Sequence, residues 1–393
     1  MRTNRGPFLC LSALVFISVW SGSARGEWVT EPVDTNYNVG LLTSLAVDSY
    51  GAPHISYYDQ TGYSLKYASM DGSYWYTQVV DTGHVGAHSS LAFYEDNAPR
   101  ISYTSYDPVQ KVVNGIKYAQ WNDSSWNTQF VQSGSNLGEY TSLAVDGQGQ
   151  PHIRYYDRGA GMLKYATMNE ATWDIQTVDA VGSVGPNSSL NSSLKLDSSG
   201  NPRIAYHNET NGTLKYAAWD DGAWLCTTVD SSAHVGAHPS LALTSTGDPI
   251  ISYFDSTNTD LKVAMYYDDD WHVGAIDTAG IVGFANSLAL KSNLPRIAYA
   301  VGDPAVDTDL KFAYWDGAAW QFEIVDSPGI VGEFVSLALD PAGVPMVSYY
   351  DRTNGDLKFA TPTGSHAPEP ATLCLVALGA FAAWTRRNRA RQR

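Results

Sequence analysis

Five aspartates recur at one position of a repeated segment, and carboxylates in such a series could bind a cation or the hydroxyl groups of a sugar. Each ends a short run of β-branched and aromatic residues such as PHISYYD. The series is Asp59, Asp107, Asp157, Asp255 and Asp351, with Asn208 in the same place once. Carboxylates are the ligands that Ca²⁺ prefers. We take these five as candidate binding residues, with no obligatory cofactor and Ca²⁺ as the ion that they could hold.

The same aspartates have a second interpretation that needs no ligand. An aspartate at the end of a strand can cap its own turn by accepting hydrogen bonds from backbone N–H groups. It can also pair with a lysine across a hairpin, as Asp59 would with Lys66. Both interpretations explain why the residue repeats, and the sequence leaves both open.

Two identical HVGAH segments carry histidines, which are frequent zinc ligands. The first holds His84 and His88, and the second holds His234 and His238. The two segments belong to repeats far apart in the chain, and a histidine pair without a third ligand is insufficient for zinc. We therefore predict no metal centre at these residues.

A repeat must position all of these side chains. The segment SLAVDSYGAPHISYYD begins at Ser44 and returns in altered form six times at intervals of 46 to 52 residues. The opening serines are Ser44, Ser90, Ser142, Ser193, Ser240, Ser287 and Ser336. A period near 40–50 residues is typical of propellers and solenoids.

Each unit contains four short segments separated by turn residues. They are of the types SLAVD, PHISYYD, LKYA and a fourth that begins with tryptophan and usually ends in Val-Asp. All four are rich in β-forming residues and too short for stable helices, which predicts four antiparallel strands per unit. We expect the repeated aromatic residues to pack between units, and the Val-Gly pair after each fourth segment to turn the chain.

The last unit is incomplete, and the N-terminus holds the missing part. The chain from Ser336 ends without a tryptophan segment, whereas WVTEPVD at Trp28–Asp34 precedes the first unit. A ring explains this split because the N-terminal strand removes the open edges, whereas a solenoid would need caps. We predict an all-β fold: a seven-bladed β-propeller over residues 27–365 with four-stranded antiparallel blades, the last completed by the N-terminal strand.

Residues 1–26 have the layout of a secretory signal peptide. Arg2 and Arg5 precede an apolar run from Phe8 to Trp20, and small residues follow. This order predicts export through the inner membrane.

The C-terminal segment, residues 366–393, has a different pattern. Pro368, Glu369 and Pro370 precede fourteen apolar residues and then five arginines. The apolar stretch is short against the ~20 residues that span a bilayer, and arginines hold such an end on the cytoplasmic side. The three features in this order resemble the PEP-CTERM sorting signal of Gram-negative bacteria. The resemblance implies that a membrane exosortase recognises the tail, that a short hydrophobic helix anchors the protein transiently, and that it then reaches the cell surface or extracellular matrix.

The charge of the body argues against anionic partners. The formal net charge is −16, but the two end segments hold eight of 24 basic residues and only one of 40 acidic residues. The body therefore carries a net charge of −23, which repels nucleic acid and anionic lipid. Exopolysaccharide or surface proteins remain as partners, and we expect a monomeric propeller.

A second resemblance concerns three hairpins. SMDGSYW, WDDGAW and WDGAAW resemble degenerate Asp-box turns of sialidases. A sialidase implies a convergent arginine cluster, a tyrosine nucleophile and acidic partners. The body has six arginines, and three of them, Arg100, Arg203 and Arg296, share one repeat position. We therefore predict a non-enzymatic binding or scaffold protein for glycan or protein, with a sialidase-like glycoside hydrolase as the alternative.

Overall fold

The computed structural model describes residues 27–182 and 192–363, which contain 28 β-strands and no helix. The first fourteen are β1 (Trp28–Asp34), β2 (Val39–Val47), β3 (Pro53–Asp59), β4 (Ser64–Asp71), β5 (Tyr74–Thr82), β6 (Val85–Ala92), β7 (Arg100–Asp107), β8 (Val112–Trp121), β9 (Trp126–Ser133), β10 (Leu137–Val145), β11 (Pro151–Asp157), β12 (Met162–Asn169), β13 (Thr172–Ala180) and β14 (Ser192–Leu196). The others are β15 (Pro202–Asn208), β16 (Thr213–Asp220), β17 (Ala223–Asp230), β18 (Val235–Leu243), β19 (Pro249–Asp255), β20 (Asp260–Tyr267), β21 (Asp270–Asp277), β22 (Val282–Lys291), β23 (Leu294–Asp303), β24 (Asp307–Trp315), β25 (Trp320–Asp326), β26 (Val331–Leu339), β27 (Pro345–Asp351) and β28 (Asp356–Pro362). The predicted signal peptide and sorting tail lie outside the described residues.

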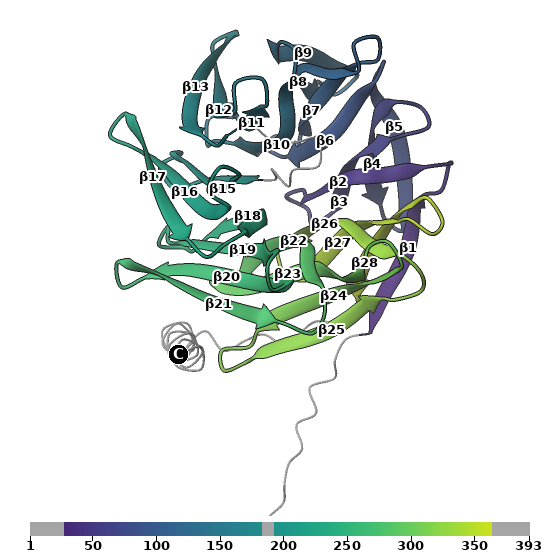
Figure 1. Ribbon diagram of the computed structural model, residues 1–393. Coiled ribbons are helices and arrows are strands. Elements are labelled where there is room, and N and C mark those ends of the chain that lie inside the picture. Colours follow the sequence, from purple (N-terminus) through teal and green to yellow (C-terminus); the bar gives the residue numbers. More distant parts are fainter. Residues whose placement is uncertain (1–26, 183–191, 364–393) are drawn as a thin grey trace, which may run out of the picture.

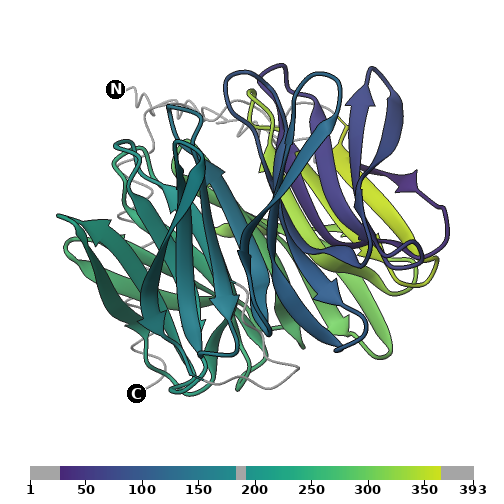
Figure 2. The same ribbon diagram turned by 90° about the horizontal axis from the view of Figure 1, so that it is seen from above.

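The strands form six hydrogen-bonded sheets, of which five have four strands and one has eight. The eight-stranded sheet consists of two repeats, β6–β9 and β10–β13, joined by one parallel contact between Leu137 and Asn114. Figure 1 shows the sheets around a common middle, with first strands such as β2, β6 and β18 innermost and fourth strands such as β5, β17 and β21 at the rim. Strands of successive sheets run side by side through the thickness of the molecule (Figure 2). The predicted all-β fold of repeated four-stranded antiparallel units is confirmed.

The N-terminal strand completes the last sheet, as the sequence predicted. β1 pairs antiparallel with β28, in a register that runs from Trp28 opposite Pro362 to Asp34 opposite Leu357. The order of that sheet is β1-β28-β27-β26, so its two ends come from opposite ends of the chain. β2 of the first sheet contacts β26 and β27 of this last sheet.

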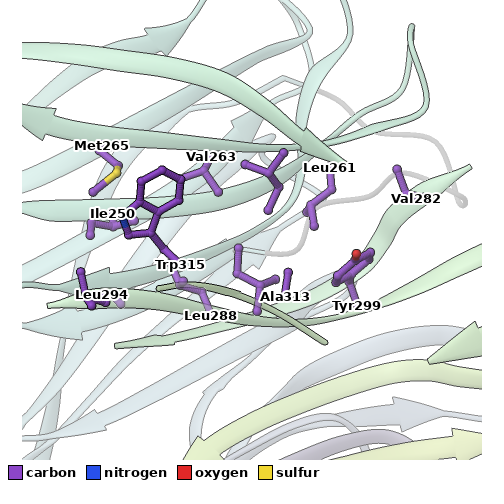
Figure 3. Packing of buried hydrophobic residues seen from close by; sticks show 13 residues of the cluster. Ile250, Leu261, Val263, Met265, Val282, Leu288, Leu294, Tyr299, Ala313 and Trp315 are labelled. Atoms are coloured by element: carbon purple, nitrogen blue, oxygen red, sulfur yellow. The ribbon is translucent and has the colours of Figure 1, made fainter. Parts of the chain in front are cut away.

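The hydrophobic core lies between neighbouring sheets. In Figure 3, Leu261 and Val263 of β20 face Leu288 and Tyr299 of the next sheet, and all four are buried. Fourth-strand tryptophans add edge-to-face contacts, such as Trp75 on Phe359 of the preceding sheet with ring centroids 5.2 Å apart. The expectation that the repeated aromatic residues pack between units is confirmed, and such packing is what holds a propeller together.

Small polar and glycine residues of the repeat also connect the sheets. The hydroxyl of Ser44 accepts the backbone N–H of Leu91 in the next sheet at 3.0 Å. Gly86 of the Val-Gly pair has φ +106°, and a Cβ there would lie 2.6 Å from Cα of Leu65. Only glycine combines this backbone conformation with so close an approach between sheets.

Candidate functional site

The aspartate of each fourth strand connects its sheet to the next one. Asp230 at the end of β17 accepts a hydrogen bond from the phenol of Tyr253 at 2.7 Å and from the ammonium group of Lys262 at 2.6 Å. Both donors belong to the following sheet, and Asp230 and Tyr253 are buried. We call this arrangement of one aspartate, one tyrosine and one lysine an inter-sheet latch.

The latch recurs between the other sheets. The remaining aspartate–tyrosine–lysine sets are Asp34 with Tyr57 and Lys66, Asp81 with Tyr103 and Lys117, Asp179 with Tyr206 and Lys215, Asp277 with Tyr299 and Lys311, and Asp326 with Tyr349 and Lys358. One junction differs because Gln132 replaces the aspartate. Tyr155 still donates to its side chain, but Lys164 turns to the hydroxyl of Thr177 at 2.8 Å.

The latches of Asp34, Asp230 and Asp277 keep their carboxylates ionised. Burial by itself raises the pKa of Asp34, but hydrogen bonds from Lys66, Tyr57 and the backbone of Asn36 outweigh it and leave the pKa below its usual range. A carboxylate that accepts several hydrogen bonds from a cation and a phenol is stabilised in its charged form. Removing one partner of such a buried ion pair strongly destabilises the fold, because the other charge is left buried without compensation.

The aspartates singled out from the sequence do end the second strands, as predicted. They lie at the last residues of β3, β7, β11, β19 and β27. Each caps its own turn: Asp59, for example, accepts the backbone N–H of Gly62 at 2.7 Å. The corresponding bonds at the other positions come from the backbone N–H groups of Val109 and Gln110 to Asp107, Ala160 to Asp157, Thr257 and Asn258 to Asp255, and Asn354 to Asp351.

The suggested hairpin pairing of Asp59 with Lys66 is wrong. Lys66 bonds to Asp34 of the neighbouring sheet, because the lysine side chain leans across the junction between sheets. In two units the lysine also approaches the second-strand aspartate, with Lys262 at 3.7 Å from Asp255. The partner was missed because it comes from a different repeat.

One junction carries an open groove, which we call the β21 groove. It lies between the end of β17 and the outer strand β21, with a volume of about 580 Å³. Of the five predicted aspartates, only Asp255 lines it. Its other lining residues include Asp230, Asn258, Asp260, Lys262, Trp271, Ala275 and Thr278.

A single small residue explains why the groove is open at this junction. Ala275 pairs across the strands with Lys262, and it lies four residues after Trp271. The residues at this position in the other fourth strands are Pro32, Val79, Phe130, Thr177, Thr228 and Ile324. At Phe130 the ring lies 5.5 Å from the ammonium group of Lys117 and covers it. Alanine is the smallest side chain in the series, so it leaves room beside Lys262.

The groove combines charged and apolar groups. Burial by itself raises the pKa of Asp230, but the hydrogen bond and charge of Lys262 and the bonds from Ser232 outweigh burial. They leave the pKa below its usual value, so the group stays ionised. Burial first, and then repulsion from Asp255, raise the pKa of Asp260. Carboxylates accept hydrogen bonds, Lys262 and the amide of Asn258 donate them, and Trp271 supplies an aromatic surface. This combination can bind a polyhydroxylated ligand.

The histidines of the two HVGAH segments separate into two environments. His84 packs against Tyr63 with ring centroids 4.4 Å apart. His88 and His238, which the sequence placed far apart, instead line one cavity of about 570 Å³ between the first strands, which we call the central cavity. Within residues 27–182 and 192–363 no group of three or more potential ligands could hold a metal ion, so the zinc interpretation gains no support.

The three arginines that share one repeat position do not converge. Arg100 pairs with Asp96, and Arg203 pairs with Asp197 and Asp220, all within their own sheets. Arg296 lies over the ring of Tyr314 in its own sheet. These three side chains therefore belong to three separate sheets.

Comparison with known protein families identifies the C-terminal segment. Residues 366–389 match the PEP-CTERM protein-sorting motif, which confirms the resemblance seen at Pro368, Glu369 and Pro370. The motif indicates an exported protein. No curated protein sequence matches the chain. In the part of the chain that the structure describes, no helix is long and apolar enough to cross a membrane.

Solved structures with a similar fold include a polysaccharide lyase and a lectin. An ulvan lyase of polysaccharide lyase family PL25 has a TM-score of 0.59 and 10% identity, over 86% of this chain and 94% of its own. A mutant of AofleA from Arthrobotrys oligospora has a TM-score of 0.52 and 13% identity, over 78% and 91%. The SapL1 lectin, solved with alpha methyl fucoside, has a TM-score of 0.50 and 12% identity, over 74% and 97%. At these identities the likeness shows the β-propeller fold alone.

Proposed function

We propose that the protein is an exported, non-enzymatic glycan-binding propeller whose ligand lies in the β21 groove. The observation that carries the proposal is Ala275, which opens one junction of the repeat and leaves Lys262, Asn258 and Trp271 beside free volume. A groove of about 580 Å³ with a few placed polar groups and an aromatic wall is typical of small-ligand sites. The lectin and polysaccharide lyase among the structural neighbours are consistent with this class of ligand.

The second-strand aspartates have a supporting role in this proposal. One oxygen of each caps a turn, and the other oxygen of Asp255 faces the groove region, where Asn258 also bonds to it at 3.0 Å. We assign ligand binding to Asp255 and retain Asp59, Asp107, Asp157 and Asp351 as weaker candidates. Calcium is not required in this mechanism, because Lys262 supplies the positive charge.

A closed ring of seven blades is the frame that we propose for this site. Counting the two repeats of the eight-stranded sheet separately gives seven four-stranded units. The latch between Asp34 and Tyr57 joins the last sheet to the first, and the hydroxyl of Ser336 accepts the backbone N–H of Leu45 across the same junction. We assign residues 27–365 to this domain, residues 1–26 to the signal peptide and residues 366–393 to the sorting tail.

Sorting places the propeller outside the cell. We propose that an exosortase-type enzyme recognises Pro368, Glu369 and Pro370, holds the protein at the inner membrane through the short apolar stretch, and releases it to the surface or matrix. Exopolysaccharide is the ligand that this location offers, and the acidic body favours neutral over anionic chains.

A glycan array tests the proposal. The protein should bind a subset of neutral oligosaccharides saturably, and Lys262→Met should abolish the signal. Binding of no glycan at millimolar concentration would contradict it. Turnover of a fluorogenic sialoside or related glycoside would instead support the glycoside hydrolase alternative, and loss of that turnover on mutating one groove residue would place the catalytic site there.

A further inference from the structure

We infer that the central cavity is a second binding site, and that its ligand is a neutral aromatic small molecule rather than a sugar. The cavity has a volume of about 570 Å³, within the range of small-molecule sites. The inference goes beyond the proposed glycan function and does not depend on it.

Rings dominate the wall of the central cavity. Tyr140, Phe254, Phe284 and Phe334 line it together with the imidazoles of His88 and His238. They come from β10, β19, β22, β26, β6 and β18, which belong to four of the six sheets. Aromatic pairs contribute about 0.5–1.5 kcal/mol beyond their buried area, and such a wall favours a ring-shaped ligand.

Several polar groups of the wall are already used within the protein, whereas one carboxylate oxygen of Glu333 has no hydrogen-bond partner among the described residues. The carboxamide of Asn286 accepts from the hydroxyl of Ser252 at 2.6 Å and donates to the carbonyls of His238 and Gly283. The hydroxyl of Ser240 accepts the backbone N–H of Leu288 at 2.9 Å. A sugar would bury several hydroxyl groups, and each one left without a partner costs about 1–3 kcal/mol. With Asn286 and Ser240 engaged, the cavity favours a ligand with few hydroxyl groups.

The carboxylate of the cavity wall is paired, and its two histidines are uncharged. Glu333 forms an ion pair with Arg352 at 2.7 Å. Burial lowers the pKa of both His88 and His238 to about 4, so their rings are neutral at ordinary pH. A neutral ligand is the one that loses least solvation on entering such a site.

Five residues that line the central cavity also have a strained backbone conformation. Leu42, His88, Tyr140, His238 and Phe334 have φ between 50° and 54°, the left-handed region that bulky residues avoid. Each such residue costs of order 1–3 kcal/mol and persists where the surrounding structure holds it in place, here at an irregularity in the pairing of five first strands. All five line the central cavity. Glycine or asparagine would hold the same backbone more easily, so we attribute the large side chains to the ligand.

N-phenyl-1-naphthylamine, a neutral aromatic fluorophore, is a direct probe of the site. The full chain should bind it saturably, with a blue-shifted emission and one site per molecule. Phe334→Gly removes a ring while relieving the backbone strain, so it should weaken binding about tenfold with little loss of melting temperature. Phe284→Ala should weaken binding to a similar degree, and Phe284, unlike Phe334, does not have a positive φ.

Phe130→Ala provides the matched control, because it removes a partly exposed ring at the rim, far from the cavity wall. It should leave the affinity for the probe unchanged. The inference is overturned if the wild-type chain binds the probe without saturation or not at all. It is equally overturned if Phe334→Gly and Phe284→Ala both bind with wild-type affinity.

Discussion

The phenol of Tyr57 donates a 2.7 Å hydrogen bond to the carboxylate of Asp34, although Asp34 lies on the N-terminal strand β1 and Tyr57 lies in the first complete sheet. Because β1 belongs to the last sheet, this bond joins the last sheet to the first. The same geometry recurs at every other junction except that of Gln132, which makes the latch a general connection between the six sheets. Its loss at the first junction should therefore be informative.

Replacing Asp34 with alanine should destabilise the protein by about 3 kcal/mol, because Lys66 would remain nearly buried without its partner. Urea unfolding followed by tryptophan fluorescence measures the change. Gln132→Ala is the control, since Lys164 does not depend on that side chain, and it should cost about 1 kcal/mol. Equal effects of the two substitutions would contradict the role given to the latch.

The histidines of the central cavity predict acid sensitivity. Burial holds the pKa of His88 and His238 at about 4, below the unfolded value of 6.5. The unfolded chain therefore binds protons first, and stability falls as the pH decreases from 6.5 to about 4, by at most about 3 kcal/mol per histidine. In the double variant His88→Asn and His238→Asn, the decline of unfolding free energy over this range should be shallower than in the wild type. An unchanged slope would mean that other groups cause it.

The latch carboxylates predict a second, more acidic loss. The pKa values of Asp34, Asp230 and Asp277 lie below the usual value of 3.8, so their stabilisation is complete above that pH and disappears as the pH falls through the lowered values. Circular dichroism during acid titration should show a cooperative transition below pH 3.8. Substituting Asp277 with asparagine should make that transition less steep, and an identical titration curve would contradict the assignment.

The Val-Gly turn should tolerate no side chain. In Gly86→Ala a new Cβ would lie 2.6 Å from Cα of Leu65 at φ +106°, so we expect a loss above about 2 kcal/mol. Gly72→Ala is the control because its φ is also positive, at +64°, but nothing lies within 4 Å of a Cβ there. It should cost only about 1 kcal/mol. Thermal unfolding of both variants checks the difference.

Much of the fold follows from the sequence because the repeat is explicit. The positions of Trp28 and of the second-strand aspartates were predicted correctly, since short-range patterns determine strand ends and pairing. The partner of Lys66 was not, because it comes from the neighbouring repeat. The β21 groove was also missed, because the sequence shows it only through a small residue, Ala275, at a position where the other units have larger residues. The shared cavity of His88 and His238 depends on how sheets surround a common middle, which no local pattern specifies.

The central claim is that the β21 groove binds a glycan because Ala275 leaves it open. Isothermal titration with the oligosaccharide selected on the array should show a saturable heat for the wild type and none for Ala275→Phe, which copies the closed junction at Phe130. The reverse variant Phe130→Ala should retain wild-type affinity. If Ala275→Phe binds the oligosaccharide as tightly as the wild type while remaining folded, the ligand lies elsewhere and the proposed function of the groove is wrong.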